Sequence, residues 1–284
     1  MFRKIEEKDI KEAVDFSWEL SKRPEKASYP LPMRREQIED EFRRSLTRED
    51  SRLLGYYKEG SLIGIVNFLF IESDKYLQTS SLYISCDYAE VMNELMAILK
   101  RDYKGYEEFF GFTKENTEAE DYFLSNGFEC IESSTDMRFM RNDFKPVEET
   151  DNIFRITEDN FNLYAPFHDK NFDGIYWTSN RIREKFDEWY IFAFKPDEYI
   201  EGSIFIKLGR GNIAVVFGTY ISKQYDNEEN REGLLSYSLD KCLNYNPEIK
   251  QAIFFIDDEE YMHKAAEKVG FKYYSSYICY GGTL

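Results

Sequence analysis

The sequence predicts two α/β domains of the same fold, arranged one after the other along the chain. Two observations lead to this prediction. A helical run that ends in Gly-Phe and leads into a strand occurs twice, and its glycines Gly127 and Gly270 stand 143 positions apart. A hairpin pattern lies upstream of each run, and the hairpin glycines Gly64 and Gly202 stand 138 positions apart. Two landmarks with nearly the same offset indicate a duplicated domain, because solenoid repeats recur at about 20 to 50 residues.

The bulk composition agrees with two globular domains. A chain of 284 residues is long enough for two domains that each have a core. Its hydrophobic content of 42% excludes a disordered chain. The 24 Phe and 22 Tyr residues are typical of aromatic packing in strands and cores.

The first half of the chain reads as strand, helix, helix, three strands, helix, strand, helix and strand. It opens with a strand at MFRKIEE, and a proline-rich stretch at 23–32 separates the first two helices. The later strands include QTSSLYISC and EEFFGFT. The helices are expected from about Asp9, over Met33–Thr47, over Ala89–Lys100 and over Asn116–Asn126.

The second half repeats this order. The segment Lys145 to Asn152 is polar and contains a proline, which is typical of a linker. We therefore expect one domain over residues 1–145 and another over residues 152–284. The stretch Gly209 to Asn212 reads as a hairpin turn rather than a phosphate-binding loop, because no helix follows it. The helices are expected over Thr157–Asp169, over Ser179–Trp189, from about Asn230 to Leu243 and over Glu259–Val269.

The net charge of −17 argues against nucleic acid and anionic membrane as partners, because phosphate groups would be repelled and no basic stripe offsets the charge. A cationic small-molecule substrate such as an amine is compatible with this charge, and solubility alone also explains it. No signal-peptide pattern opens the sequence, and no stretch approaches the roughly 20 apolar residues that span a bilayer. These observations predict a cytoplasmic location and leave the oligomeric state open.

The cysteines and histidines do not suggest a metal centre. The four cysteines are dispersed without a CxxC pair, and His168 and His263 are the only histidines. We expect all four thiols to be buried in a reducing compartment, and we expect no metal. The cysteines are Cys86, Cys130, Cys242 and Cys279.

The last helix of the first half carries a spacing that resembles a family motif. Asn116, Ala119, Phe123, Gly127 and Phe128 follow the pattern N-x-x-A-x-x-x-Y-x-x-x-G-F, with phenylalanine at the tyrosine position. This spacing and the repeated element order resemble the GNAT acetyltransferase superfamily over nearly the whole chain. The resemblance implies two units, each with a mixed, mostly antiparallel twisted sheet flanked by helices. It also implies acetyl-CoA as cosubstrate, held in a gap between the fourth and fifth strands.

The first half departs from the family pattern where the cofactor would bind. The family's tyrosine often protonates the leaving thiolate, and the phenyl ring of Phe123 cannot do this. The loop after the fourth strand contains no glycine, and Asp87 and Glu90 lie where phosphates would approach. We therefore expect the first unit to bind no CoA and to serve a structural or substrate-shaping role.

The second half keeps more of the cofactor site that the resemblance implies. Its fourth strand offers main-chain donors for the pantetheine arm of CoA. The run Asn230 to Leu235 aligns with the family's Q/R-x-x-G-x-G/A loop, which wraps the pyrophosphate at a helix N-terminus. Glu228 and its neighbouring glutamates would repel the pyrophosphate, and Arg231 and Lys223 are the available counter-charges. The expected cofactor-binding residues are Phe217, Gly218, Thr219, Tyr220, Asn230, Arg231, Gly233 and Leu234.

Three residues are the candidates for the chemistry of transfer. Asp257 ends the fifth strand and is a candidate base, with a helix-cap role as the alternative. His168 ends the first helix of the second unit, where the family often builds its acceptor pocket, and a surface histidine near a helix C-terminus is the alternative. Tyr220 is a candidate proton donor to the sulfur, as are Tyr277 and Tyr280 on the last strand, and strand packing is the alternative for all three.

The leading functional prediction is acetyl transfer from acetyl-CoA to an amine of a small molecule, in the second unit. Direct attack of a positioned amine needs no covalent intermediate on the protein. The first unit would help to form the acceptor cleft. The alternative is a catalytically degenerate binding or scaffold protein. A tandem ligase similar to the peptidoglycan-bridge enzymes is less favoured, because no helical insertion of that kind is visible.

Overall fold

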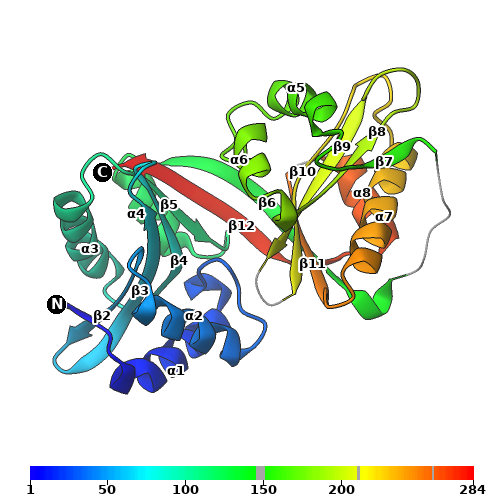
Figure 1. Cartoon of the computed structure of the whole chain (residues 1–284). Helices are drawn as coiled ribbons and strands as arrows, with labels where there is room; N and C mark the ends of the chain where they lie inside the picture. The colour runs from blue at the N-terminus through cyan, green and yellow to red at the C-terminus, as the bar shows by residue number, and fades with distance from the viewer. Residues whose placement is uncertain (145–150, 210–211, 258) are drawn as a thin grey trace. The chain divides into compact units, whose positions relative to one another are not determined.

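The computed structural model describes residues 1–144, 151–209, 212–257 and 259–284, and it divides into two compact units (Figure 1). The first unit contains residues 1–133 and 276–284, and the second contains residues 134–275. The elements follow the predicted order, strand-helix-helix-three strands-helix-strand-helix-strand, in each half of the chain. Residues 145–150 of the predicted linker Lys145 to Asn152, and residues 210–211 at the centre of the predicted turn, lie outside the described residues.

The first unit contains a mixed sheet in the order β1-β2-β3-β4-β5-β12, in which only β4 and β5 are parallel. One core cluster joins α1 and α2 to the sheet, and another joins α3 and α4 to it. The strands are β1 (Phe2–Lys4), β2 (Ser51–Lys58), β3 (Ser61–Ile71), β4 (Tyr76–Ile84), β5 (Glu107–Phe112) and β12 (Lys272–Thr283). The helices are α1 (Ile10–Ser21), α2 (Arg35–Thr47), α3 (Tyr88–Asp102) and α4 (Thr117–Ser125).

The second unit contains a sheet in the order β6-β11-β10-β9-β8-β7, in which only β10 and β11 are parallel. One core cluster contains side chains of α7 and α8, and the other contains side chains of α5 and α6. The strands are β6 (Glu129–Met140), β7 (Ile153–Ile156), β8 (Trp189–Phe194), β9 (Gly202–Gly209), β10 (Ile213–Ile221) and β11 (Gln251–Ile256). The helices are α5 (Phe161–Asn171), α6 (Ser179–Glu184), α7 (Glu228–Tyr245) and α8 (Glu260–Val269).

Each unit takes its last strand from the other half of the sequence. β12 pairs antiparallel with β5, so that Tyr280 lies opposite Phe110. β6 pairs antiparallel with β11, so that Phe139 lies opposite Ala252. The compact units therefore differ from the expected ranges 1–145 and 152–284, because the sequence pattern shows that a strand is present but not which neighbour it pairs with.

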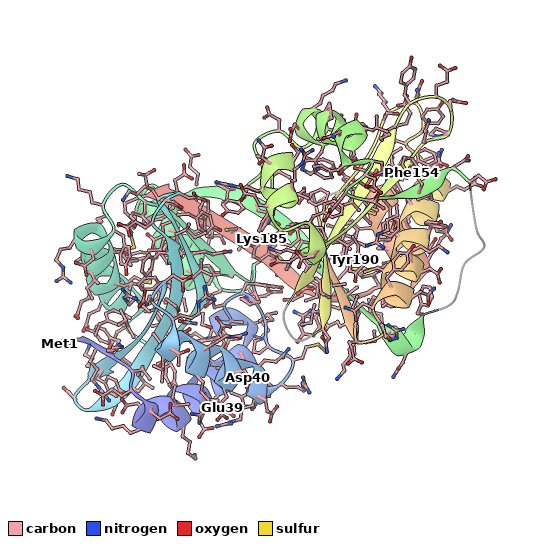
Figure 2. All side chains as sticks on the ribbon, in the orientation of Figure 1. Met1, Glu39, Asp40, Phe154, Lys185 and Tyr190 are labelled. Atoms are coloured by element: carbon pink, nitrogen blue, oxygen red, sulfur yellow. The ribbon has the colours of Figure 1, made fainter. Side chains whose placement is uncertain are left out.

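Figure 2 draws the described side chains on the ribbon of the chain. The exchanged strands are anchored by buried aromatic side chains within each unit. Tyr280 is 1% exposed and stacks on Phe123 at 5.5 Å between ring centroids. Phe139 is fully buried and contacts Phe271 at 5.5 Å. Burial of such rings contributes about 2–3 kcal/mol each, so both strands are integral to the cores that they complete.

The thiols correct one expectation. Cys242 and Cys279 are buried as expected, but Cys86 and Cys130 are exposed. Cys86 lies just beyond the end of β4, and Cys130 is the second residue of β6, so both thiols are at strand ends outside the buried parts of these strands. Burial raises the pKa of the Cys242 thiol to about 12.

Candidate functional site

In the second unit, the parallel strands β10 and β11 pair over a short length and then separate. Their paired residues run from Ile213 opposite Gln251 to Val216 opposite Phe254. At the same point the register between β10 and β9 shifts, which makes Phe217 the extra residue of a β-bulge. A bulge increases the local twist and bends its strand, so it explains why β10 leaves β11 here.

The bulge also changes which way the next side chains point. The ring of Phe217 is 46% exposed and lies 5.5 Å from Trp189 and 6.2 Å from Trp177, measured between centroids. A Cβ atom on Gly218 would lie 2.5 Å from Cε1 of Phe205. Glycine is therefore needed at position 218, because any side chain there would collide with the ring of Phe205.

Tyr220 lies on β10 beyond the bulge and is half-buried. Its ring packs 5.8 Å from Phe167 and 6.3 Å from Phe172, both from the α5 region. The ring of Tyr220 therefore packs against neighbouring aromatic side chains, as the alternative of strand packing expects. The role of Tyr220 as a proton donor stays a prediction. Tyr277 and Tyr280, the other candidate donors, belong to the first unit because β12 completes that sheet.

The predicted phosphate loop is part of a helix. α7 begins at Glu228, so the run from Asn230 to Leu235 lies within its first turns. The side chain of Asn227 caps the helix by accepting a hydrogen bond from the Asn230 amide at 2.9 Å. The Arg231 amide donates to the Asn227 carbonyl at 3.1 Å. These two amides are in use, which corrects the expectation that the run offers them to a pyrophosphate.

Arg231 is not an available counter-charge, which corrects a second expectation. Its guanidinium is held between two carboxylates: Nε lies 2.5 Å from Asp226 Oδ1, and Nη1 pairs with Glu259. The residue is only 8% exposed. Glu228 also pairs with a cation, Lys268. The cations at the start of α7 are therefore committed to carboxylates, which outnumber them there, so the region does not attract an anion.

The two remaining predicted cofactor residues on α7 behave differently. A Cβ atom on Gly233 would have no neighbour within 4 Å, so α7 leaves open space at this point. Leu234 is 1% exposed and belongs to the core that contains Leu235 and Leu239. Leu234 thus stabilises the helix against the sheet, and only Gly233 keeps room for a ligand.

Asp257 follows β11 and is exposed at the point where the two strands have parted. Partial burial of its carboxyl and the nearby charge of Glu259 raise the pKa of Asp257. Its side chain does not cap α8, whose N-cap is Glu259. The main-chain carbonyl of Asp257 lies 3.1 Å from Nε2 of His263. This contact links the end of β11 to the first turn of α8.

His168 is fully buried in α5, which corrects the alternative of a surface histidine. Its Nε2 lies 2.8 Å from the carbonyl oxygen of Trp177, and its Nδ1 lies 2.9 Å from Tyr164 Oη. A carbonyl only accepts, so Nε2 carries the proton and Nδ1 accepts from the tyrosine. Burial lowers the pKa of His168 and keeps the ring neutral. This geometry fits a structural tie between α5 and the loop at Trp177.

In the first unit, the matching gap between β4 and β5 contains a segment of the chain itself. β4 and β5 pair only as far as Gln78 opposite Phe109. The loop between α1 and α2 then enters: the Tyr29 amide donates to the Gly111 carbonyl at 2.9 Å, and Ser28 Oγ accepts from the Leu82 amide at 2.9 Å. These bonds support the expectation that the first unit binds no CoA.

The start of α3 in the first unit is also unsuited to phosphate. Lys58 Nζ lies 2.8 Å from Asp87 and 2.7 Å from Glu90, so the lysine is committed to both carboxylates. Phe123, at the family's tyrosine position, is fully buried and 4.5 Å from Phe110 between ring centroids. Asp87 and Glu90 thus form surface ion pairs, and Phe123 forms part of the core.

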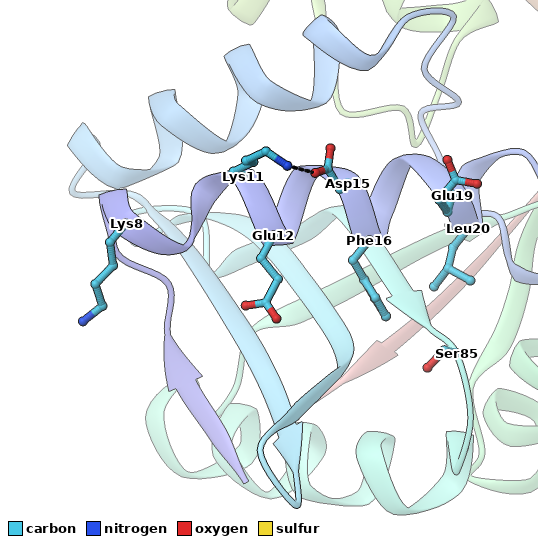
Figure 3. A pocket seen from close by; sticks show the side chains of 8 residues that line it. All are labelled: Lys8, Lys11, Glu12, Asp15, Phe16, Glu19, Leu20 and Ser85. Carbon is cyan, nitrogen blue, oxygen red and sulfur yellow. Dashed lines mark hydrogen bonds and ion pairs between the residues drawn. The ribbon is translucent and has the colours of Figure 1, made fainter.

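An open depression of about 820 Å³ lies along α1 in the first unit (Figure 3). Its wall contains both signs of charge, including a Lys11–Asp15 pair at 2.7 Å, and the apolar side chains of Phe16 and Leu20. It contains none of the predicted site residues. Its mixed lining indicates no particular ligand.

Within the described residues, no group of three or more His, Cys, Asp or Glu side chains is placed to hold a metal ion. A search of the same residues found no helix with the length and apolar character that crossing a membrane requires.

Comparison with known proteins assigns the fold. No family model matches the chain, and no curated protein matches it significantly. Among solved structures, a GCN5-related N-acetyltransferase from Sphaerobacter thermophilus is similar with a TM-score of 0.69 and 10% identity, over 100% of this chain and 95% of that chain. A tandem GNAT protein from the clavulanic acid biosynthesis pathway is similar with a TM-score of 0.59 and 11% identity, over 100% and 98%. The chain therefore has the tandem GNAT fold, as the sequence predicted.

The residues of the second unit fit one part of acyl-CoA and not another. The parted strand β10, with its bulge at Phe217 and the open space at Gly233, fits the pantetheine arm. The start of α7 offers the pyrophosphate little, because the Arg231 guanidinium already pairs with Asp226 and Glu259 and the Asn230 amide is bound by the Asn227 side chain. A ligand that binds here would be held mainly by β10.

Proposed function

We propose that the second unit binds acyl-CoA by its pantetheine arm and transfers the acyl group to an amine of a small molecule. The separation of β10 from β11 after Val216, in a chain with the tandem GNAT fold, carries this proposal. When bound, the thioester supplies an activated acyl group that a positioned amine attacks directly.

The main chain of β10 provides the binding surface in this proposal. Among Phe217, Gly218 and Thr219, the amides that face away from β9 are the candidate donors to the arm, because the bulge turns this part of the strand away from β11. The open space at Gly233 leaves room beside the start of α7. Because the pyrophosphate finds no free cation in Arg231, we expect the affinity to depend little on the diphosphate end.

Asp257 and Tyr220 have complementary roles. An amine must lose a proton as its nitrogen acylates, and the exposed carboxylate of Asp257 accepts this proton. Its raised pKa makes it a better base than an ordinary aspartate. Tyr220 Oη provides the proton that the leaving sulfur takes up. The acidic surroundings of Asp257, including Glu259, favour cationic amines as acceptors.

A second function, ligand binding without transfer, is favoured by one observation. The family's tyrosine position in α8 is Ala266, which is fully buried in the core and offers no proton. If the second unit binds its ligand without transferring a group, Tyr220 takes part in no reaction. For either function we infer a cytoplasmic site of action, since the four thiols of the chain are free, as in a reducing compartment.

Calorimetric titration with acetyl-CoA and with S-acetylpantetheine tests the proposal. We expect both donors to bind with similar affinity, because S-acetylpantetheine lacks only the diphosphate and nucleotide end of acetyl-CoA, to which we expect the affinity to be insensitive. Gly233→Leu should weaken both by about tenfold or more through lost space, while Asn244→Leu, on the exposed C-terminal part of the same helix, should not. Absence of binding heat with both donors would overturn the proposal. Binding without acyl transfer to any of a panel of amines would establish the second function.

A further inference from the structure

A small pocket of about 240 Å³ lies between α3 and α4 of the first unit, away from the residues considered for acyl transfer. Its wall has two parts. The side chains at the rim are exposed, whereas Met96, Tyr122 and Phe128 are at most 9% exposed and form the inner wall. The residues that line the pocket are Asn93, Met96, Ala97, Lys100, Tyr122, Asn126 and Phe128.

The carboxyl group of Glu108 lies beneath the inner wall of this pocket. Glu108 and Phe110 are two positions apart on β5 and therefore project from the same face of the sheet. The ring of Phe110 packs 5.9 Å from the ring of Phe128, measured between centroids. Gly282 lies opposite Glu108 on β12, and a Cβ atom on Gly282 would lie 2.7 Å from the ring of Phe128. The Phe128 ring that lines the pocket thus covers the strand positions around Glu108.

Two other lining residues interact electrostatically with Glu108. Burial raises the pKa of Glu108, and the charge of Lys100 on α3 opposes this shift. Burial also raises the pKa of Tyr122 on α4, and the charge of Glu108 adds to that shift. The neighbouring strands bring no charge to this position, since the residues opposite Glu108 are Leu77 on β4 and Gly282 on β12. The charged groups that act on Glu108 therefore belong to the wall of the pocket.

Glu108 itself is an unsatisfied acceptor. Its side chain is fully buried, and neither carboxylate oxygen has a hydrogen-bond partner within the described part of the chain. A buried polar group without a partner is costly and calls for an explanation. A ligand that brings a donor to the floor of the pocket satisfies these oxygens. The unbranched side chain of Met96 in the inner wall is suited to move aside for such a group.

The rim of the pocket provides groups of the opposite kind. Lys100 is exposed at the rim and carries a positive charge. Asn93 Oδ1 accepts a hydrogen bond from Tyr122 Oη at 3.0 Å, which leaves the Nδ2 group of Asn93 as a further donor. A carboxylate at the rim can accept from both residues. The pocket therefore has an acceptor at its floor and donors at its rim.

We propose that the pocket between α3 and α4 binds a small amino acid as its zwitterion, with the ammonium group on Glu108 and the carboxylate on Lys100 and Asn93. This inference concerns the first unit and does not depend on the acyl transfer proposed for the second. The rings of Tyr122 and Phe128 border the cationic end and keep water from the ion pair, which strengthens it. On binding, Glu108 gives its proton to solvent and faces the ammonium group as a carboxylate.

Calorimetric titration of the full chain at pH 7 with glycine, β-alanine and 4-aminobutyrate tests the inference. Ethylamine and propionate are the probes that carry a single charge. We expect at least one amino acid to bind about tenfold more tightly than either single-charge probe, because it is paired at both ends. Titration in buffers of different ionisation enthalpy should show proton release on binding. Failure of all three amino acids to bind, ethylamine binding as tightly as the best of them, or binding without proton release would overturn the inference.

Variants at the floor and at the rim test the two ends of the ligand separately. Glu108→Gln keeps the size of the side chain and removes its charge, so amino-acid binding should fall about tenfold or more. Glu107→Gln, at an exposed position of the same strand, should bind as the parent chain does. Lys100→Met should reduce amino-acid binding to the level of ethylamine, whereas Lys104→Met, beyond the end of α3, should not.

Unchanged binding in Glu108→Gln or in Lys100→Met would contradict the inference. Urea unfolding shows whether each variant is folded. If Glu108→Gln does not fold, Lys100→Met decides, because its exposed side chain can be replaced without disturbing the core.

Discussion

Glu108 lies in the middle of the first unit's sheet, and replacing it should change how stability depends on pH. Its side chain is fully buried on β5, between β4 and β12. Among the described residues, neither carboxylate oxygen has a hydrogen-bond partner. Burial raises the pKa of Glu108 well above its ordinary value, and the charge of Lys100 opposes this shift. The folded first unit therefore keeps Glu108 protonated over a pH range in which the unfolded chain ionises it.

The sign and size of the effect follow from proton linkage. An unfolded glutamate ionises near pH 4, so above that pH unfolding releases the proton that the folded state holds. The free energy of unfolding then falls as pH rises, by about 1.4 kcal/mol for each pH unit until the folded carboxyl itself ionises. Glu108→Gln removes this term and should flatten the pH dependence. Glu108→Leu also removes an unsatisfied buried group and should stabilise the first unit by about 1–3 kcal/mol at pH 7.

Urea unfolding of the parent and variant chains at pH 5.5, 6.5 and 7.5 measures these slopes, and hydrogen exchange of the 107–112 segment assigns them to the first unit. The matched control is Glu107→Gln, an exposed neighbour on the same strand, which should leave the slope unchanged. Identical slopes for the parent and for Glu108→Gln would show that Glu108 is ionised in the folded state and would refute the reasoning.

Two further predictions concern the exchanged strand and the thiols. Tyr280→Ala, close to the end of β12, should destabilise the first unit by about 3 kcal/mol, because the buried ring of Tyr280 stacks on Phe123. Hydrogen exchange should then accelerate in β5 and not in β10. Faster exchange in β10 alone would contradict the observed pairing of β12 with β5. Ellman's reagent should titrate two thiols in the folded chain and four in urea, because burial raises the pKa of Cys242 and of Cys279 to about 12; rapid reaction of all four thiols without urea would contradict their burial.

The element order and the repeat could be predicted from the sequence because they depend on local periodicity and on glycine positions. Gly127 and Gly270, which mark the repeat, both have a left-handed backbone that glycine adopts readily at the end of a helix, so this constraint is visible in the sequence. Strand exchange could not be predicted in this way. Residues of β12 have the same pattern whichever fifth strand they pair with, and no local rule selects β5 over β11.

The candidate site was predicted unevenly for a similar reason. The strand that carries Phe217 was predicted because its pattern is local, whereas the bulge at Phe217 depends on the register with β9 and was not predicted. The role of Arg231 was missed because its charge partners, Asp226 and Glu259, approach it only after α7 and α8 pack together. The entry of Ser28 between β4 and β5 was also missed, since a loop's destination depends on tertiary structure.

The exchange of strands also sets an order for synthesis and folding. β12 follows every other strand in the chain, and it completes the sheet to which β1 belongs. A nascent chain therefore carries an open edge at β5 while the whole second half is translated, and an open edge is a template for unwanted pairing. The half that is made first is thus the half that closes last, and its protection during translation depends on how quickly the later half emerges and folds.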